Sequence, residues 1–139
     1  MPGPHRILFV CVENACRSQM AEGFARHYGG DHVIAVSAGS RPRGRVDETA
    51  MAAMREKGIS LDAHVSKGFA QLPNQTWDVV VTMGCGDACP QIPAKKRLDW
   101  TIPNPAWQPL DGYRQIRDLI EQRVRELLEE LDRGACDPS

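Results

Sequence analysis

The chain has 139 residues, of which 17 are Lys or Arg and 18 are Asp or Glu, giving a formal net charge of -1. This length suffices for one domain whose hydrophobic core needs no metal or disulfide for stability. Basic residues alternate with acidic ones, which excludes the basic stripe that nucleic-acid binding requires. We therefore predict one domain over residues 1–139, with no nucleic-acid partner.

The first apolar run is too short for a membrane span, and the N-terminus lacks the regions of a signal peptide. We therefore predict a cytoplasmic protein with no membrane partner. Five cysteines are present, although disulfide frameworks are rare in the cytoplasm. These cysteines call for a catalytic, redox or metal-binding explanation.

Apolar runs typical of buried strands alternate with apolar stripes typical of helices. In chain order the pattern predicts a strand at 7–12, a helix around 20–28, a strand at 32–38, a helix from the N-cap Asp47 to about Lys57, strands at 77–83 and 96–100, and a final helix that includes 116–131. Gly58 is the expected stop of the second helix. This alternation favours an α/β fold with a parallel sheet, helices on both faces and ligands beyond the carboxyl ends of the strands.

The loop after the first strand has the sequence Cys11-Val-Glu-Asn-Ala-Cys-Arg17-Ser18. A short loop that turns into a helix directs backbone N–H groups at one point, and the helix N-terminus adds positive potential, so this loop is expected to bind a tetrahedral oxyanion. The planar guanidinium of Arg17 can bind two oxygens of such an anion. The same potential favours the thiolate of Cys11, to which Ser18 could donate a hydrogen bond. We therefore predict that Cys11 is a nucleophile rather than a buried apolar residue at a strand end.

This motif resembles the phosphate-binding loop of the low-molecular-weight tyrosine phosphatases, and the string Cys16-Arg-Ser-Gln-Met-Ala-Glu-Gly23 is similar to the arsenate reductases that share their fold. The similarity covers nearly the whole chain and includes Val36-Ser-Ala-Gly39, Val81-Thr-Met83, Cys89-Pro90 and the segment from Trp100 to Ala106. It implies a single α/β domain with a four-stranded parallel sheet flanked by helices. It also implies that Cys11 attacks the oxyanion, Arg17 binds it and Asn14 holds the loop in shape. The implied substrate-binding residues are Val12, Glu13, Asn14, Ala15, Cys16 and Arg17.

Two further cysteines, Cys85 and Cys89, follow the third predicted strand and so lie at the same sheet edge as Cys11. The resemblance implies a relay in which Cys85 attacks the sulfur of the Cys11 adduct and Cys89 then displaces Cys11. The predicted catalytic residues are Cys11, Arg17, Ser18, Cys85 and Cys89. The spacing departs from the best-known family pattern, because Gly84 intervenes after the strand and only three residues separate the two cysteines.

Two other interpretations of this cysteine pair stay open. A zinc site would need about four ligands, but the sequence has no second close pair of Cys or His residues, so we predict no metal. Inert loop cysteines are the second interpretation. Of the remaining cysteines, Cys16 is expected to be packed and Cys136 to be a dispensable surface thiol.

The resemblance implies arsenate as substrate, with phosphate and sulfate as competing oxyanions. No bound cofactor is expected, but the relay needs an external thiol reductant. This reductant is either thioredoxin, or glutathione or mycothiol acting through a glutaredoxin-like protein. A low-molecular-weight tyrosine phosphatase and a non-catalytic oxyanion-binding protein are the alternative functions.

Two positions depart from the family pattern. Asn104 stands where these enzymes carry a general-acid aspartate before a Pro, and an amide cannot supply the proton. Lys67 stands where potassium-binding members carry an aspartate, beside groups that match Asn14, Glu22 and Ser37. We predict that the Lys67 ammonium replaces the metal ion and pairs with Glu22, the alternative being a solvated lysine.

Other candidate residues receive structural interpretations. His64, Trp77, Trp100 and Trp107 are expected to pack in the core or at a pocket rim, and Arg41, Arg43 and Arg45 to lie on a solvated loop.

Overall fold

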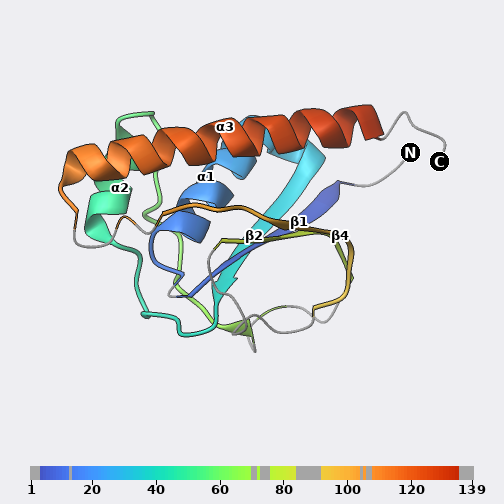
Figure 1. The fold of residues 1–139 in the computed structure, drawn as a ribbon, viewed down its shortest axis with the longest axis horizontal. Coiled ribbons are helices and arrows are strands. Elements are labelled where there is room, and N and C mark those ends of the chain that lie inside the picture. The colour runs from blue at the N-terminus through green and yellow to red at the C-terminus, as the bar shows by residue number, and fades with distance from the viewer. Residues whose placement is uncertain are drawn as a thin grey trace.

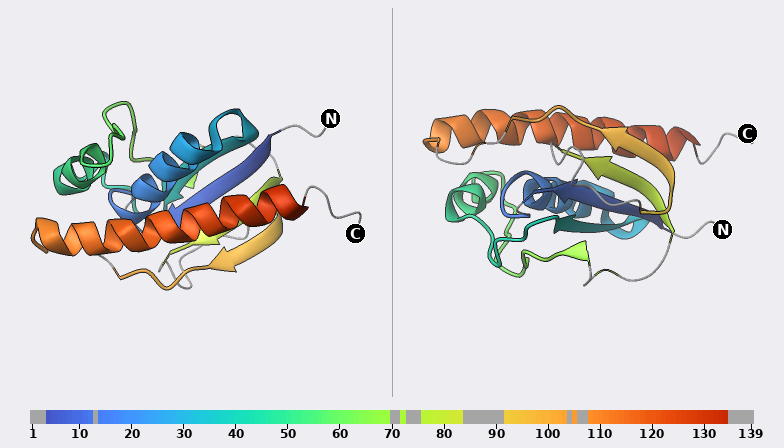
Figure 2. Two further views of the ribbon diagram at one scale, coloured as in Figure 1. Left: turned by 90° about the horizontal axis from the view of Figure 1, so that it is seen from above. Right: turned by 60° about the horizontal axis from the view of Figure 1, so that its bottom comes forward.

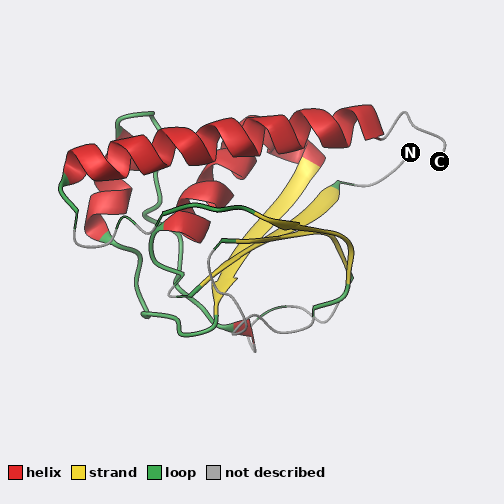
Figure 3. Cartoon of the chain, in the orientation of Figure 1, coloured by secondary structure: helices red, strands yellow, loops and turns green. Residues whose placement is uncertain are grey.

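A computed structural model of the chain describes residues 4–12, 14–69, 72, 76–83, 92–103, 105 and 108–134. Its elements are β1 (His5–Cys11), α1 (Arg17–Gly29), a short 3-10 helix (Gly30–His32), β2 (Val33–Gly39), α2 (Glu48–Arg55), β3 (Trp77–Thr82), β4 (Ala94–Asp99) and α3 (Leu110–Gly134). Figure 1 labels these elements, and Figure 3 separates helices, strands and loops by colour. The predicted order of strands and helices is confirmed, with ends that differ by a few residues.

The four strands form one parallel sheet in the order β2-β1-β3-β4, which confirms the implied sheet. At its carboxyl edge Cys11 is paired with Gly39, and Val10 with Thr82. Because the strands are parallel, the segments that follow β1, β2 and β3 all leave the sheet at this edge. The loops that carry the predicted catalytic cysteines, after β1 and β3, therefore start next to each other.

One face of the sheet carries the helices. Ile7 and Phe9 point to this side and pack with Met20 and Phe24 of α1 and with Ile120 of α3 in one buried cluster. Figure 2 shows α1 and α3 lying next to each other over the sheet, with α3 running along the whole molecule. Burial of these apolar side chains is the main stabilising contribution expected for such a layer.

The second face is packed by a smaller apolar cluster. Its buried part is formed by Leu8, Val10, Ala38, Trp77 and Val80. Partly buried side chains cover it, namely Val12, Val36, Phe69, Leu72, Ile92 and Ala94. The alternation of strands and helices predicts a helical layer on this face as well, and no such layer is found within the described residues.

Helix α2 begins after the predicted N-cap and ends at Arg55, two residues before the predicted end at about Lys57. The Oδ1 atom of Asp47 accepts hydrogen bonds from the backbone N–H groups of Thr49 at 2.8 Å and Ala50 at 3.2 Å, which confirms Asp47 as the N-cap. Gly58 has a φ of 76°, a left-handed conformation that glycine adopts without steric cost, and it stops the helix. Among the described helices, none is both long and apolar enough to span a membrane.

Candidate active site

The loop between β1 and α1 is held by hydrogen bonds to its carbonyl groups. Glu13 lies outside the described residues. The backbone N–H groups of Ser40, Arg41 and Asp47 donate to the carbonyls of Cys11 at 3.3 Å, Val12 at 2.7 Å and Ala15 at 3.0 Å, and the Gln19 side-chain amide donates to the Asn14 carbonyl at 3.1 Å. These donors all lie outside the loop.

The direction of these carbonyls determines where the loop N–H groups point. A trans peptide directs its C=O and N–H to opposite sides, and no cis peptide occurs among the described residues. The N–H groups of Val12, Ala15 and Cys16 therefore face away from the outer partners, toward the interior of the loop. Together with the free N–H groups in the first turn of α1, they form a cradle suited to a tetrahedral oxyanion.

Gly39 and Asn14 allow this tight loop. A Cβ atom on Gly39 would lie 2.5 Å from the Val12 carbonyl oxygen and 2.8 Å from the Asn14 nitrogen, so only glycine fits. Asn14 has a φ of 52°, in the left-handed region that asparagine tolerates better than most residues. Its Oδ1 accepts from the Lys67 backbone N–H at 2.8 Å and from Gln19 Nε2 at 3.0 Å, and these bonds hold the turn in place.

The thiol of Cys11 is 2.9 Å from the hydroxyl of Ser18, and both residues are buried. The Asn14 side-chain amide donates to the Ser18 oxygen at 2.8 Å. The hydroxyl hydrogen is then directed at the Cys11 sulfur, which accepts it best as a thiolate. The arrangement fits the nucleophile role predicted for Cys11.

Arg17, the first residue of α1, is 8% exposed. Its Nη1 donates to the Ile102 carbonyl at 3.1 Å, and a guanidinium carries further N–H donors for an oxyanion. Ile102 precedes Asn104 by two residues, so the chain reaches Arg17 just before the predicted general-acid position. Asn104 itself lies outside the described residues.

Glu22 is the centre of a second polar cluster beside the loop. Its side chain is 3% exposed and pairs with the Arg26 guanidinium at 3.0 Å. The Ser37 hydroxyl donates to Glu22 Oε1 at 2.5 Å, and the Lys67 ammonium lies 4.0 Å from the same oxygen. The three residues predicted to replace a cation site, Lys67, Glu22 and Ser37, therefore do lie together.

His64 connects this cluster to the loop. Its Nδ1 is 3.0 Å from Gln19 Oε1 and 3.6 Å from Glu22 Oε2, and its side chain is 8% exposed. Gln19 uses its amide nitrogen to donate to Asn14, so its oxygen is the acceptor and His64 Nδ1 carries the hydrogen. The predicted packing role of His64 is thus incomplete, because the ring also orients the glutamine that holds Asn14.

Burial governs the protonation of His64 and Lys67. It lowers the pKa of His64 below its usual value, and the Glu22 carboxylate opposes this only in part. Burial likewise lowers the pKa of Lys67, again opposed by Glu22. His64 is accordingly neutral at neutral pH.

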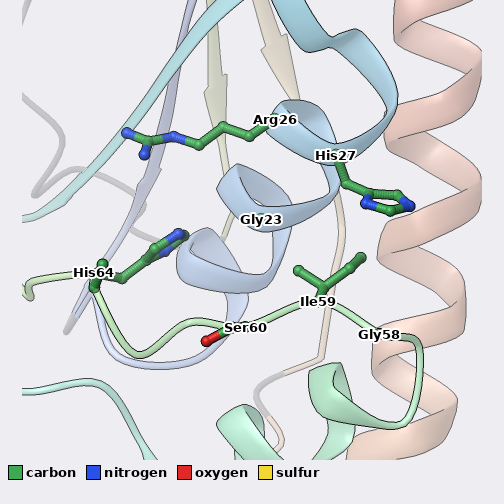
Figure 4. Close-up of a pocket in the computed structure, with 8 residues that line it drawn as sticks. Gly23, Arg26, His27, Gly58, Ile59, Ser60 and His64 are labelled. Atoms are coloured by element: carbon green, nitrogen blue, oxygen red, sulfur yellow. The ribbon is translucent and has the colours of Figure 1, made fainter.

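A hollow of about 370 Å³ lies between α1 and the segment after α2. Figure 4 shows His64 reaching toward α1 at one side of it, with Arg26 and His27 leaving α1 in opposite directions. It is lined by Gly23, Arg26, His27, Gly58, Ile59, Ser60, Ala63 and His64. Among the described residues of the Cys11–Ser18 loop, none lines this hollow, so it is distinct from the part of the oxyanion cradle that these residues form.

Cys16 is a buried thiol, as predicted, and is 5% exposed. Burial, with a further contribution from the nearby Asp47 carboxylate, raises the pKa of Cys16 to about 12. It therefore stays protonated at neutral pH.

The other predicted residues fall into two groups. Trp77 is 1% exposed in the core, the Trp100 ring packs 6.0 Å from Phe9, and Arg41 and Arg45 are exposed on their loop. Cys85, Cys89, Trp107 and Cys136 lie outside the described residues. Within the described ranges, no group of three or more His, Cys, Asp or Glu side chains is placed to hold a metal ion.

Two contributors to the loop are absent from the sequence predictions: Gln19, and Asp47 as a partner of Ala15. Asp47 is recognised only as a helix cap. Gln19 lies on the first turn of α1, but nothing in its local pattern distinguishes it from a solvated helix residue. Only the packed structure reveals these roles.

A parallel-sheet strand that leads through a cysteine-containing oxyanion cradle into a helix defines a class of α/β proteins built for thiol chemistry on tetrahedral oxyanions. A family model described as low molecular weight phosphotyrosine protein phosphatase matches residues 6–136. The chain belongs to this family.

Similar proteins of the family confirm the resemblance to its arsenate reductases. A protein from Synechocystis named glutaredoxin arsenate reductase is 34% identical over 129 residues, covering 91% of this chain and 98% of its own. A solved arsenate reductase in the phosphate binding state has a TM-score of 0.82 and 32% identity, and the match covers 91% of this chain and 98% of that one. A thioredoxin-dependent arsenate reductase of Corynebacterium glutamicum has a TM-score of 0.80 and 32% identity, covering 95% of this chain and 64% of that one.

Proposed function

We propose that this protein reduces arsenate to arsenite, with Cys11 as the nucleophile and Cys85 and Cys89 as a disulfide relay. The observation that carries the proposal is the buried Cys11 sulfur, which lies 2.9 Å from the Ser18 hydroxyl at the start of the loop whose N–H groups face inward. The names of the similar family members support arsenate as the oxyanion.

In the first step the Cys11 thiolate attacks arsenic(V), and one oxygen of arsenate, carrying two protons, leaves as water. The cradle N–H groups and the Arg17 guanidinium neutralise the charge on the remaining oxygens. The product is a Cys11–arsenic(V) adduct.

In the second step the Cys85 thiolate attacks the Cys11 sulfur. The electron pair of the sulfur–arsenic bond stays on arsenic, which leaves as arsenite, and a Cys11–Cys85 disulfide remains. Cys89 then attacks Cys85, and Cys11 leaves as a thiolate that the Ser18 hydroxyl stabilises. An external dithiol supplies two electrons to reduce the Cys85–Cys89 disulfide.

The end of β3 supports Cys85 as the thiol that attacks Cys11. The backbone N–H of Met83 donates to the Val10 carbonyl at 2.8 Å, one residue before Cys11. Cys85 follows Met83 by two residues, and a chain spans at most about 3.6 Å per residue. The stretch of two residues beyond Met83 is therefore short enough for the proposed attack of Cys85 on Cys11.

The reductant is proposed to be thioredoxin or a glutaredoxin-like protein with a low-molecular-weight thiol, in the cytoplasm. The printed names of two similar proteins, one glutaredoxin and one thioredoxin-dependent, support this class of partner. Phosphate and sulfate are expected to compete for the cradle.

The test follows arsenate-dependent NADPH oxidation with thioredoxin and its reductase, then with glutathione and glutaredoxin, then with mycothiol and mycoredoxin. Turnover with at least one system, lost in Cys11→Ser, supports the proposal. The family description favours a phosphatase as the second candidate. Sustained hydrolysis of an aryl phosphate without any thiol, and no arsenate-dependent oxidation, would establish that candidate instead.

A further inference from the structure

Asp47 joins three parts of the molecule. Its carboxylate Oδ1 caps α2, and its backbone N–H donates to the Ala15 carbonyl of the oxyanion loop at 3.0 Å. Its second carboxylate oxygen accepts from the hydroxyl of Tyr113, on α3, at 3.1 Å. Loop, α2 and α3 therefore meet at one aspartate.

The Tyr113 hydroxyl also touches the loop directly. It lies 4.0 Å from the sulfur of Cys16, and Tyr113 is 2% exposed. The hydroxyl has one hydrogen, which it gives to Asp47, so the Cys16 thiol is the donor in this weak contact. The donors run in one direction, from Cys16 through Tyr113 to the Asp47 carboxylate.

These contacts act on both sides of a single peptide group. The Ala15 carbonyl is held by the Asp47 N–H, and the Cys16 side chain is held by Tyr113. Rotation of the Ala15–Cys16 peptide would break the hydrogen bond from the Asp47 N–H to the Ala15 carbonyl. The same rotation would turn the Cys16 N–H away from the interior of the cradle.

We propose that Tyr113 and Asp47 are positioning residues that hold the Ala15–Cys16 peptide with its N–H directed at the bound oxyanion. The inference rests on the oxyanion-binding part of the proposed function and does not require reduction. The Tyr113 ring packs in the core, whereas its hydroxyl serves Asp47 and Cys16. The Arg43 guanidinium also pairs with Asp47, at 3.2 Å, but it is partly exposed and contributes less.

The test is binding of inorganic phosphate, measured by titration calorimetry on the reduced full-length protein. Tyr113→Phe keeps the ring, and Asp47→Ser keeps a helix cap and the backbone N–H, yet each removes the link between the two residues. Each variant is expected to raise the Kd for phosphate by about three- to ten-fold. The double variant is expected to bind no more weakly than the weaker single variant, because both break one connection.

Tyr28→Phe is the matched control. It removes a second tyrosine hydroxyl that donates to a carboxylate, Glu121 of α3 at 2.5 Å, but does so at a partly exposed site away from the loop. Its Kd for phosphate should match that of the parent protein. In arsenate reduction, Tyr113→Phe should raise KM while kcat at saturation changes little.

The proposal is overturned if Tyr113→Phe and Asp47→Ser bind phosphate as Tyr28→Phe does while their thermal stability falls. That result would show that Tyr113 and Asp47 stabilise the fold but do not position the peptide for oxyanion binding. The proposal would also be contradicted if the fold-increases in Kd of the two single variants multiplied in the double variant. Because phosphate binding needs no reductant, normal phosphate binding without arsenate reduction would reject the proposed function and leave this inference intact.

Discussion

The Cys11 sulfur lies 2.9 Å from the Ser18 hydroxyl, whose oxygen in turn accepts a hydrogen bond from the Asn14 amide at 2.8 Å. The Asn14 bond directs the hydroxyl hydrogen at the sulfur. This relationship determines how readily the thiolate forms and how well it leaves.

Ser18→Ala should therefore slow alkylation of Cys11 by iodoacetamide at neutral pH by about ten- to hundred-fold, as expected for the loss of a hydrogen bond to a charged group. Ser40→Ala is the control, since the Ser40 Oγ is the buried side-chain oxygen that lacks a hydrogen-bond partner within the described residues. Equal alkylation profiles for both variants would show that Ser18 does not stabilise the thiolate.

His64 should make the fold sensitive to mild acid. Burial lowers the pKa of His64 in the folded protein. The positive charges of Arg26 and Lys67 lower this pKa further, and the Glu22 carboxylate opposes them. Above about pH 6.5, which is the ordinary pKa of histidine, the ring is mainly neutral in both the folded and the unfolded chain. Below this pH the unfolded chain binds the proton more readily than the folded chain does, so the free energy of unfolding decreases as the pH falls.

Urea unfolding at pH 7.5 and pH 5.5 tests this expectation. The loss of stability between these values should be smaller in His64→Gln, which keeps a donor for Gln19, than in the parent protein. His32→Gln, at an exposed position, should behave as the parent does. A loss that is the same in all three proteins would assign the acid sensitivity to other groups.

Lys67 should make an added cation unnecessary. Its ammonium lies 4.0 Å from Glu22, which the Ser37 hydroxyl also contacts. Thermal stability and arsenate reduction should therefore be equal in potassium and in sodium at the same ionic strength. In Lys67→Asp, both should become higher in potassium than in sodium.

A parent protein that is markedly more stable and more active in potassium would contradict the internal-cation role of Lys67. The same measurement on Lys57→Asp, at an exposed site after α2 where the ammonium pairs with Glu121 of α3, controls for the change of charge.

Asn104 should limit phosphatase activity. The Arg17 guanidinium donates to the Ile102 carbonyl, and the family resemblance implies a general-acid position two residues later. Asn104→Asp should raise aryl phosphate hydrolysis by about ten-fold or more, because general acid catalysis is worth at least this much for a poor leaving group. Arsenate reduction should gain less, because its leaving oxygen can take protons from solution.

Both activities are measured on the same purified variant. An unchanged phosphatase rate would mean that position 104 does not face the leaving group, or that another residue already supplies the proton.

Local patterns predicted the elements that position the site. The apolar run before Cys11, the Asp47 cap and the Gly58 stop each act over a few residues, so their structural outcome follows from short-range sterics and hydrogen bonding. The Cys11-to-Arg17 spacing likewise predicted a cradle. A short loop between a strand and a helix can adopt few conformations, because both of its ends are fixed.

Contacts between distant residues could not be predicted in the same way. His64 meets Gln19 across 45 residues, and Tyr113 meets Cys16 across 97. Each contact depends on how α1, α2 and α3 pack against the sheet, which no local pattern encodes. The side chains that orient the cradle can therefore be identified only from the folded structure.

The most direct test of the relay is a single turnover of Cys89→Ser with arsenate and no external reductant. We expect about one arsenite per protein chain, and peptide mass spectrometry should find a Cys11–Cys85 disulfide with Cys16 still a free thiol. Absence of arsenite with all thiols still reduced, or a disulfide that omits Cys85, would contradict the proposed relay.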